Sequence, residues 1–380
     1  MDFLYYKFDE LGLFIAIILG SLLMLQILYF ILVYGRVGSK KKKTKVNNEK
    51  FSVSVVICVQ SESKNLEEKL PIVLEQEYPN FEVVIVNEDS EENSYNKQVL
   101  RALSQVYSNL QIVNIPNNIN YFQGKKFPIS LGIKTAKNEI IILTDDDTMP
   151  TCYTWIDEIV ERFTKGKEIV IGYTAIETKK GLLNSLIQYD NHTIALNYLG
   201  NAILGNPYMG RGKNLAFKRD LFFRQGGYIS HYVIPVGEDD IFINKVSTKK
   251  NTNFVLSKDS INLCKARIKY RDFKMDKKKL ILSQKHFKLI DRFIIDLIPF
   301  TTFLIYLLIG FAIYINIPWQ YLITALIIRF SVQIIIYYRT IKALGTKKIA
   351  IFAPLFELFF MFYNTIIRIN TLTSKGKKWN

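Results

Sequence analysis

Three consecutive aspartates, Asp145, Asp146 and Asp147, follow an apolar run at 140–143, with only Thr144 between them. A short apolar run bounded by polar residues predicts a buried strand. Acidic residues at the carboxyl end of such a strand lie where open α/β sheets bind their ligands. Because neighbouring carboxylates repel one another, a divalent cation with oxygen ligands suits the triplet, and such a cation commonly bridges the phosphates of a nucleotide. The alternative is an acidic turn without a ligand.

The segments around the triplet predict the elements that position it. Short apolar runs at 53–59, 81–86 and 110–113 predict three more strands, and the stretches 66–77 and 126–137 predict helices. Strand and helix alternate along the chain. We therefore expect parallel βαβ units and a doubly wound, mainly parallel α/β sheet.

Composition favours a membrane-associated protein. The 380-residue chain has a formal net charge of +16, and much of its basic charge flanks apolar runs. This placement indicates contact with anionic lipid headgroups, so we expect membrane lipids and no nucleic acid as partners. The three cysteines are far apart and form no CxxC pair, which indicates neither a zinc site nor a disulfide framework.

A first membrane span is predicted at residues 11–34, which carry no charged side chain. A helix needs about 20 apolar residues to cross a bilayer. The basic cluster from Lys40 to Lys43 follows this stretch, and such a cluster marks the cytoplasmic side. We therefore expect an integral protein of the plasma or inner membrane, with its N-terminus outside and the domain that follows Lys40 in the cytoplasm.

Three further apolar segments follow a strongly basic stretch; they cover residues 293–315, 319–338 and 349–367. Arg329 lies in the middle of the second segment, where it must face protein, water or an anionic group. Pro354 and nearby polar residues leave open whether the third segment spans the membrane or lies at its surface. Four full spans would place the C-terminus outside, whereas its lysines favour the cytoplasm.

Several more motifs occur in order between about residues 52 and 246. They are a strand followed by Glu62, a second strand followed by Glu88 and Asp89, Gly124-Lys125-Lys126 before a helix, the acidic triplet, the glycine-rich stretch from Gly210 to Phe217, and Gly237-Glu238-Asp239-Asp240. In this order they resemble the family 2 glycosyltransferases. The resemblance implies a Rossmann-like, nucleotide-sugar-binding domain of the GT-A fold.

The resemblance also implies which residues bind the donor and a metal. Its donor-binding positions correspond to Glu62, Glu88, Asp89, Lys125, Lys126 and Asp145. The family's uracil-binding aspartate is replaced here by Glu88, and its first-strand asparagine by Ser61. Asp145 and Asp147 form the family's DxD pair, which implies that they hold Mg²⁺ or Mn²⁺ against the diphosphate leaving group.

The last two motifs correspond to the acceptor side of the reaction. The resemblance implies that Gly210, Gly212 and Asn214 lie in the acceptor region. It also implies that Asp239 is the general base, with Glu238 and Asp240 as close alternatives. Inverting transfer needs such a base on the acceptor hydroxyl, opposite the departing diphosphate.

Together these patterns divide the chain into five parts. They are an N-terminal transmembrane anchor (1–36), a basic cytoplasmic linker (37–50), a GT-A catalytic domain (51–264), a basic interfacial segment (265–292) and C-terminal transmembrane or interfacial helices (293–380).

We therefore expect a membrane-bound inverting glycosyltransferase of the hexosyltransferase type. It would transfer a sugar from a nucleoside-diphosphate sugar, with UDP as the expected nucleotide, to a lipid-linked or glycan acceptor at the cytoplasmic face. A processive polysaccharide synthase is one alternative, but no QxxRW motif follows the final acidic motif. A catalytically silent membrane scaffold that binds glycan or lipid is the other, because Ser61 and Glu88 depart from the family pattern.

Overall fold

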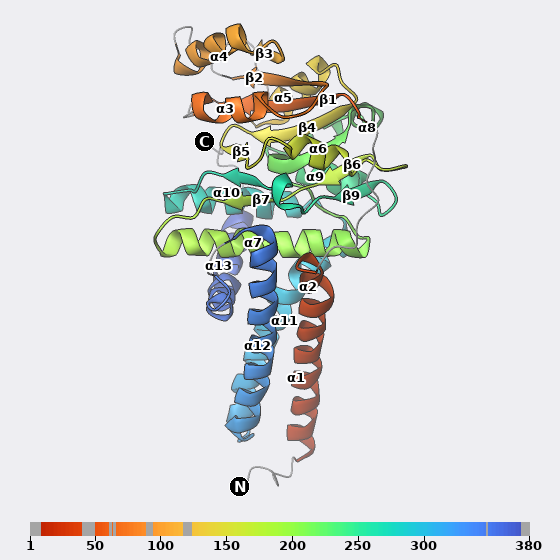
Figure 1. The fold of residues 1–380 in the computed structure, drawn as a ribbon. Helices are drawn as coiled ribbons and strands as arrows, with labels where there is room; N and C mark the ends of the chain where they lie inside the picture. The colour runs from red at the N-terminus through yellow and green to blue at the C-terminus, as the bar shows by residue number, and fades with distance from the viewer. Residues whose placement is uncertain are drawn as a thin grey trace.

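The computed structural model describes residues 9–39, 50–60, 63, 66–88, 94–116, 124–346 and 349–373. Figure 1 shows two layers, an α/β domain and a bundle of long helices, with helix α7 (Leu182–Leu204) running across the top of the bundle between them. Helix α10 (Tyr270–Gln284) lies beside α7, on the side of the α/β domain.

A seven-stranded sheet forms the centre of the α/β domain, in the order β3-β2-β1-β4-β8-β6-β9. Its strands are β1 (Val53–Val59), β2 (Phe81–Asn87), β3 (Leu110–Asn114), β4 (Ile140–Asp145), β6 (Ile169–Ile171), β8 (Leu215–Lys218) and β9 (Thr252–Phe254). Strand β1 pairs in parallel with β2 and β4, and only β8 runs antiparallel to its neighbours in this sheet. The predicted mainly parallel α/β sheet is confirmed.

Burial explains why the strand pattern is so apolar. Every residue of β1 is buried, as are the first five residues of β4. Parallel strands are covered on both faces by helices, so they form almost continuous apolar runs. The covering helices are α3 (Leu66–Leu74), α4 (Tyr95–Val106), α5 (Lys126–Thr135), α6 (Trp155–Val160), α8 (Arg219–Arg224) and α9 (Asp240–Val246).

Helix α3 is shorter than the predicted helix at 66–77. Its α-helical part ends at Leu74. The buried amide of Gln76 then donates to the carbonyls of Ile72 and Cys152, which fixes the chain in a turn. A small second sheet, in the order β5-β10-β7, was not predicted; it consists of β5 (Thr148–Pro150), β7 (Thr174–Ile176) and β10 (Asn262–Cys264).

Three helices among the described residues are long and apolar enough to cross a membrane. The first is α1 (Glu10–Tyr29), which continues through a π-helical turn, η2 (Phe30–Tyr34), and α2 (Gly35–Val37); the others are α11 (Leu289–Tyr314) and α12 (Trp319–Leu344). They run side by side in Figure 1. The fourth predicted segment forms α13 (Ala353–Thr373), which is not one of the three. Four full spans were therefore not found, and the interfacial alternative is kept for α13.

A buried polar network joins the helices of the bundle. Arg329 of α12 donates to Gln26 of α1 at 2.9 Å and to Glu357 of α13 at 2.5 Å. Gln26 also donates to Thr301 and Thr302 of α11 at 2.8 and 2.9 Å. Arg329 is 2% exposed. The expectation that this arginine faces protein is confirmed, because its charge is met by a carboxylate on another helix.

Candidate active site

A cavity of about 560 Å³ opens where β4 ends. Its volume falls within the range of about 300–1,000 Å³ that is common for small-molecule sites. The acidic triplet lines it on one side, and the loop before α9 lines it on the other. Its charged lining also includes Lys125, Arg211, Lys213 and Arg267. We refer to this space as the active-site cavity.

Asp147 is held by two basic side chains. The ammonium of Lys213 donates to both of its carboxylate oxygens, at 2.6 and 2.7 Å, and Arg267 lies 3.5 Å from Oδ2. Burial alone would raise the pKa of Asp147, but the charge and hydrogen bonds of Lys213, together with the charges of Lys125 and Arg267, outweigh it and hold that pKa well below the usual range. Asp147 is therefore a carboxylate at every pH at which the protein would be assayed.

The other two aspartates of the triplet have different surroundings. Asp145 accepts a hydrogen bond from Lys125 at 2.7 Å and lies 3.9 Å from Lys213. Asp146 turns towards α3, where its carboxylate accepts a hydrogen bond from Ser63 and its carbonyl accepts one from Lys69 at 2.8 Å. Burial raises the pKa of Asp146. The roles of Asp145 and Asp147 as the DxD pair, with Asp146 as the intervening residue, stay a prediction.

Asp145 and Asp147 fit a divalent cation that takes the rest of its ligands from the substrate. Within the described residues, no three His, Cys, Asp or Glu side chains are arranged to hold a metal. Mg²⁺ is, however, commonly bound by one or two carboxylates together with substrate phosphates and water. A cation on Asp147 would compete with Lys213 for the same two oxygens.

Asp239, on the opposite side of the cavity, is fixed by two backbone amides. The N–H of Gly212 donates to Oδ2, and the N–H of Asp240 donates to Oδ1 at 2.8 Å. A Cβ atom at residue 212 would lie 3.1 Å from Oδ2, so a larger side chain there would press on the carboxylate. Asp239 is also the N-cap of α9, which sets the direction of its side chain.

The pKa values of Glu238 and Asp240, the two acids next to Asp239, are strongly raised. Burial, followed by repulsion from Asp239, raises the pKa of Glu238 to about 7. The same two causes raise the pKa of Asp240 well above its usual range. The carboxylate of Asp240 accepts a hydrogen bond from Ser283 of α10 at 3.0 Å. All three acids line the active-site cavity, so the structure brings the predicted catalytic residues together.

The glycine-rich stretch serves the site in a different way from that predicted. Gly210 packs inside the protein, where a Cβ would lie 2.9 Å from Leu215. Asn214 is 2% exposed and donates to the carbonyls of Tyr173 and Ser260, both at 2.8 Å. The prediction that Asn214 contacts the acceptor is therefore not supported, since its amide is used to brace the loop. Gly212 does lie at the site, against Asp239.

Of the predicted donor-binding residues that the structure describes, only some line the active-site cavity. Lys125 lines the active-site cavity, but the ammonium of Lys126 is turned towards the carbonyls of Ile234 and Val236. Glu88 follows β2, and its backbone N–H donates to the carbonyl of Val59 at 2.9 Å. Glu88 is not among the described residues that line the active-site cavity. Glu62 and Asp89 lie outside the described residues.

The sequence did not reveal the roles of Lys213 and Arg267, the two basic residues beside Asp147. Lys213 was part of a predicted motif but was given no role, and Arg267 was assigned to a lipid-facing stretch. A lysine between the glycine and asparagine of the Gly212-Lys213-Asn214 stretch was the available signal for the first. No local signal distinguished Arg267 from the many basic residues around it.

Comparison with known proteins agrees with this geometry. Residues 54–223 match the family model described as glycosyl transferase family 2. The chain is 24% identical over 218 residues to the glycosyltransferase AglE of Haloferax volcanii, an alignment that covers 57% of this chain and 67% of AglE.

Solved structures give the same fold. The mannosyltransferase PcManGT from Pyrobaculum calidifontis, in complex with GDP-Man and Mn²⁺, superimposes with a TM-score of 0.63 at 17% identity, over 95% of this chain and 99% of that one. Residues 1–349 of TarS from S. aureus, in complex with UDP-GlcNAc, score 0.42 at 15% identity, over 84% of this chain and 89% of theirs, which is too low to support an argument. Residues 54–223 thus form a domain that matches glycosyl transferase family 2, the chain has a GT-A fold, and its described residues include three helices able to span a membrane.

Proposed function

We propose that the protein is a membrane-bound, inverting glycosyltransferase that uses a nucleoside-diphosphate sugar. One observation supports this most strongly: two adjacent residues of a single loop connect the two acidic clusters. Gly212 holds Asp239 through its amide, and Lys213 holds Asp147 through its ammonium. A donor diphosphate beside Asp147 and an acceptor beside Asp239 would thus be positioned by one rigid segment.

In the proposed mechanism, Lys125, Lys213 and Arg267 bind the negatively charged diphosphate, and Asp145 and Asp147 would hold Mg²⁺ or Mn²⁺. The cation supplies Lewis-acid stabilisation of the leaving group. Asp239 accepts the proton of an acceptor hydroxyl as its oxygen bonds to the anomeric carbon. The bond from that carbon to the diphosphate oxygen breaks on the opposite face, so the configuration inverts. Glu238, when ionised, places a negative charge beside Asp239 on the acceptor side of the site.

Two donors are the first to test. A UDP-sugar follows from the resemblance of the β2 motif to uracil-binding sites, although Glu88 replaces the usual aspartate. A GDP-sugar is suggested by PcManGT, which holds GDP-Man. The acceptor is a lipid-linked or glycan molecule, and the missing QxxRW motif favours transfer of one sugar over polymerisation.

We also propose that the catalytic domain faces the cytoplasm. With three spans and an outside N-terminus, both the domain and the lysine-rich C-terminal tail lie on the cytoplasmic side. A last helix at the membrane surface thereby removes the conflict that four spans create.

Detergent-solubilised protein assayed against UDP- and GDP-linked hexoses, with Mn²⁺ or with chelator, tests the proposal. We expect transfer from one donor group that depends on the cation, with a product of opposite anomeric configuration by NMR. Retention of configuration, or no turnover with any of these donors, would contradict it.

A further inference from the structure

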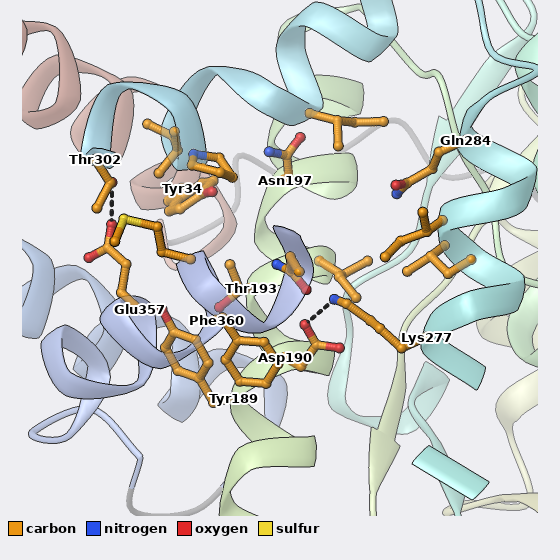
Figure 2. A pocket seen from close by; sticks show the side chains of 18 of the residues that line it. Tyr34, Tyr189, Asp190, Thr193, Asn197, Lys277, Gln284, Thr302, Glu357 and Phe360 are labelled. Atoms are coloured by element: carbon orange, nitrogen blue, oxygen red, sulfur yellow. Dashed lines mark hydrogen bonds and ion pairs between the residues drawn. The ribbon is translucent and has the colours of Figure 1, made fainter. Parts of the chain in front are cut away.

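Two lysines among the described residues have buried side chains, Lys126 and Lys277, with 5% and 6% of their surface exposed. A buried ammonium is costly unless a partner compensates its charge. Lys277 has such a partner, because it donates to the carboxylate of Asp190 at 2.5 Å, and Figure 2 shows these two side chains facing each other. Lys126 donates instead to two backbone carbonyls, that of Ile234 and, at 2.7 Å, that of Val236. Its burial therefore needs another explanation.

The two carbonyls belong to the segment 234–236, which leads directly into Glu238 and Asp239 through a single glycine. Lys126 is the first residue of α5, so its ammonium joins the start of this helix to the segment that precedes the proposed base. Burial lowers the pKa of Lys126, and the negative charges of Glu238 and Asp239 oppose this effect. The cation therefore lies within electrostatic reach of both acids.

Gly124 contacts the same segment through its backbone. Its φ is +126°, and a Cβ atom there would lie 3.1 Å from the carbonyl oxygen of Pro235. Lys125, between Gly124 and Lys126, points the other way and donates to Asp145 at 2.7 Å. Three consecutive residues thus touch both the donor side of the active-site cavity and the segment before the base.

We propose that Lys126 is a positioning residue, whose ammonium holds the segment 234–236 so that the Asp239 carboxylate keeps its place in the active-site cavity. Lys126 acts on the reaction through Asp239 and is not a ligand of the donor. The proposal rests on the proposed function, since it takes Asp239 as the base. It deepens that function, because a base that is misplaced by about 1 Å can cost 10²-fold in rate.

Hydrogen–deuterium exchange of the full-length protein in detergent tests the placement of Asp239 without turnover. The backbone N–H groups of Gly212 and Asp240 both donate to the Asp239 carboxylate, so their exchange rates report whether it stays in place. Lys126→Met removes the ammonium, keeps a long side chain and leaves two carbonyls without their donor. We expect exchange at both amides to rise about tenfold. Unchanged exchange in this variant would overturn the proposal.

Lys167→Met is the matched control. Lys167 also donates to two backbone carbonyls, those of Lys249 and Thr252, at 2.7 and 2.8 Å. It is not among the described residues that line the active-site cavity. Its loss should therefore leave the exchange of both reporter amides as it is in the wild type. A rise equal to that in Lys126→Met would mean that any such lysine has this effect, which contradicts a specific role for Lys126.

A pair of glycines provides a second test that keeps all lysines. Gly124→Ala presses a methyl group on the carbonyl of Pro235, whereas Gly181, with a φ of +115°, has nothing within 4 Å of the place of a Cβ. Both alanines carry backbone strain, but only the first pushes on the segment 234–236. Thermal unfolding shows whether Lys126→Met folds. If it does not, Gly124→Ala decides: faster exchange of the reporter amides than in Gly181→Ala is expected, and equal exchange would overturn the proposal.

Kinetics show whether Lys126 acts through the base. In Lys126→Met, kcat should fall about 10²-fold with nucleotide affinity within a few-fold of the wild type, whereas Lys125→Met should lose about tenfold in nucleotide affinity. In an Asp239→Asn background, Lys126→Met should lower kcat by less than about threefold, because residues that act as a unit are not additive. A full 10²-fold loss in that background, or a tenfold loss of nucleotide affinity in Lys126→Met, would overturn the proposal.

These outcomes also separate the role of Lys126 from the proposed function. Full turnover by Asp239→Asn would refute the proposed base, while the exchange rates would still show whether Lys126 holds the segment. Conversely, lost turnover in Asp239→Asn together with unchanged exchange in Lys126→Met would overturn the role of Lys126 alone.

Discussion

Lys213 donates to both carboxylate oxygens of Asp147, so the residue predicted to bind a metal is already paired with a side-chain cation. The two residues come from different parts of the chain, one from the glycine-rich loop and one from the end of β4. Arg267, 3.5 Å from Asp147, and Lys125, 2.7 Å from Asp145, add further positive charge on the donor side of the site.

Lys213→Met should separate metal binding from donor binding. Without the ammonium, Asp147 keeps only the more distant Arg267 beside it, so Mn²⁺ affinity in the absence of donor should rise about tenfold, while donor affinity falls by a similar factor through the lost charge-assisted bond. Calorimetric titration of Mn²⁺ and then of nucleotide measures both effects. Lys179→Met, at an exposed lysine paired with Glu177, is the control. Unchanged Mn²⁺ affinity would show that Lys213 does not compete for Asp147.

Two glycines of the same loop should respond differently to alanine. Gly212→Ala places a methyl group against the Asp239 carboxylate, so kcat should fall about 10²-fold with little change in the melting temperature. Gly210→Ala places its methyl group 2.9 Å from Leu215 in the interior and should instead lower stability by about 1–3 kcal/mol. Thermal unfolding and steady-state kinetics on both variants provide the comparison. If both lose stability equally, Gly212 has no special relation to the base.

The raised pKa of Glu238, about 7, predicts a pH dependence of the reaction. Below this pH Glu238 is protonated, so the acceptor side of the site loses a negative charge that would attract the proton leaving the acceptor hydroxyl. The value of kcat/KM should therefore fall as the pH drops from about 8 to about 6. In Glu238→Gln this step near neutrality should disappear. If this step persists unchanged in Glu238→Gln, it belongs to another group and not to Glu238.

The same shift has a consequence for stability. Because the pKa of Glu238 in the folded protein lies above its ordinary value of 4.5, the stability that Glu238 contributes is fully present below that value and is lost as the pH rises through about 7. Glu238→Gln should accordingly melt higher than the wild type at about pH 8, and the difference should shrink as the pH falls towards about 5. Thermal unfolding of both proteins across this pH range shows whether the difference in melting temperature has the predicted sign.

The buried ion pair in the helix bundle predicts a rescue. Arg329→Met leaves Glu357 without its cation and should cost about 3–5 kcal/mol, whereas Arg329→Met/Glu357→Gln should recover much of that loss. Unfolding in graded SDS–detergent mixtures measures both variants. Arg339→Met, at an exposed position of the same helix, is the control and should change stability by less than about 0.5 kcal/mol. Additive losses in the double variant would show that the two charges are not coupled.

Local patterns predicted much of the fold. The runs that form β1, β2 and β4 are apolar because these strands are buried on both faces, so composition and length sufficed to place them. The acids after β4 and before α9 could be expected near one another because ligand sites form at the carboxyl edge of such sheets.

Contacts between distant residues could not be predicted in this way. Lys213 and Asp147 are 66 residues apart, and nothing local distinguishes this lysine from the many others. Asn214 fits the predicted motif, yet its amide is used inside the protein, which only the packing around Tyr173 reveals. The apolar length of α13 suggested a span, but Glu357 and Arg368 meet partners on α12 and α11.

The most direct test of the proposed mechanism is sugar transfer by Asp239→Asn, measured beside nucleotide binding. The account predicts that kcat falls by about 10²- to 10⁴-fold, the usual contribution of a general base, while the nucleotide binds within a few-fold of its wild-type affinity. Turnover close to that of the wild type, in a variant that is folded and binds nucleotide, would contradict the assignment of Asp239 as the base.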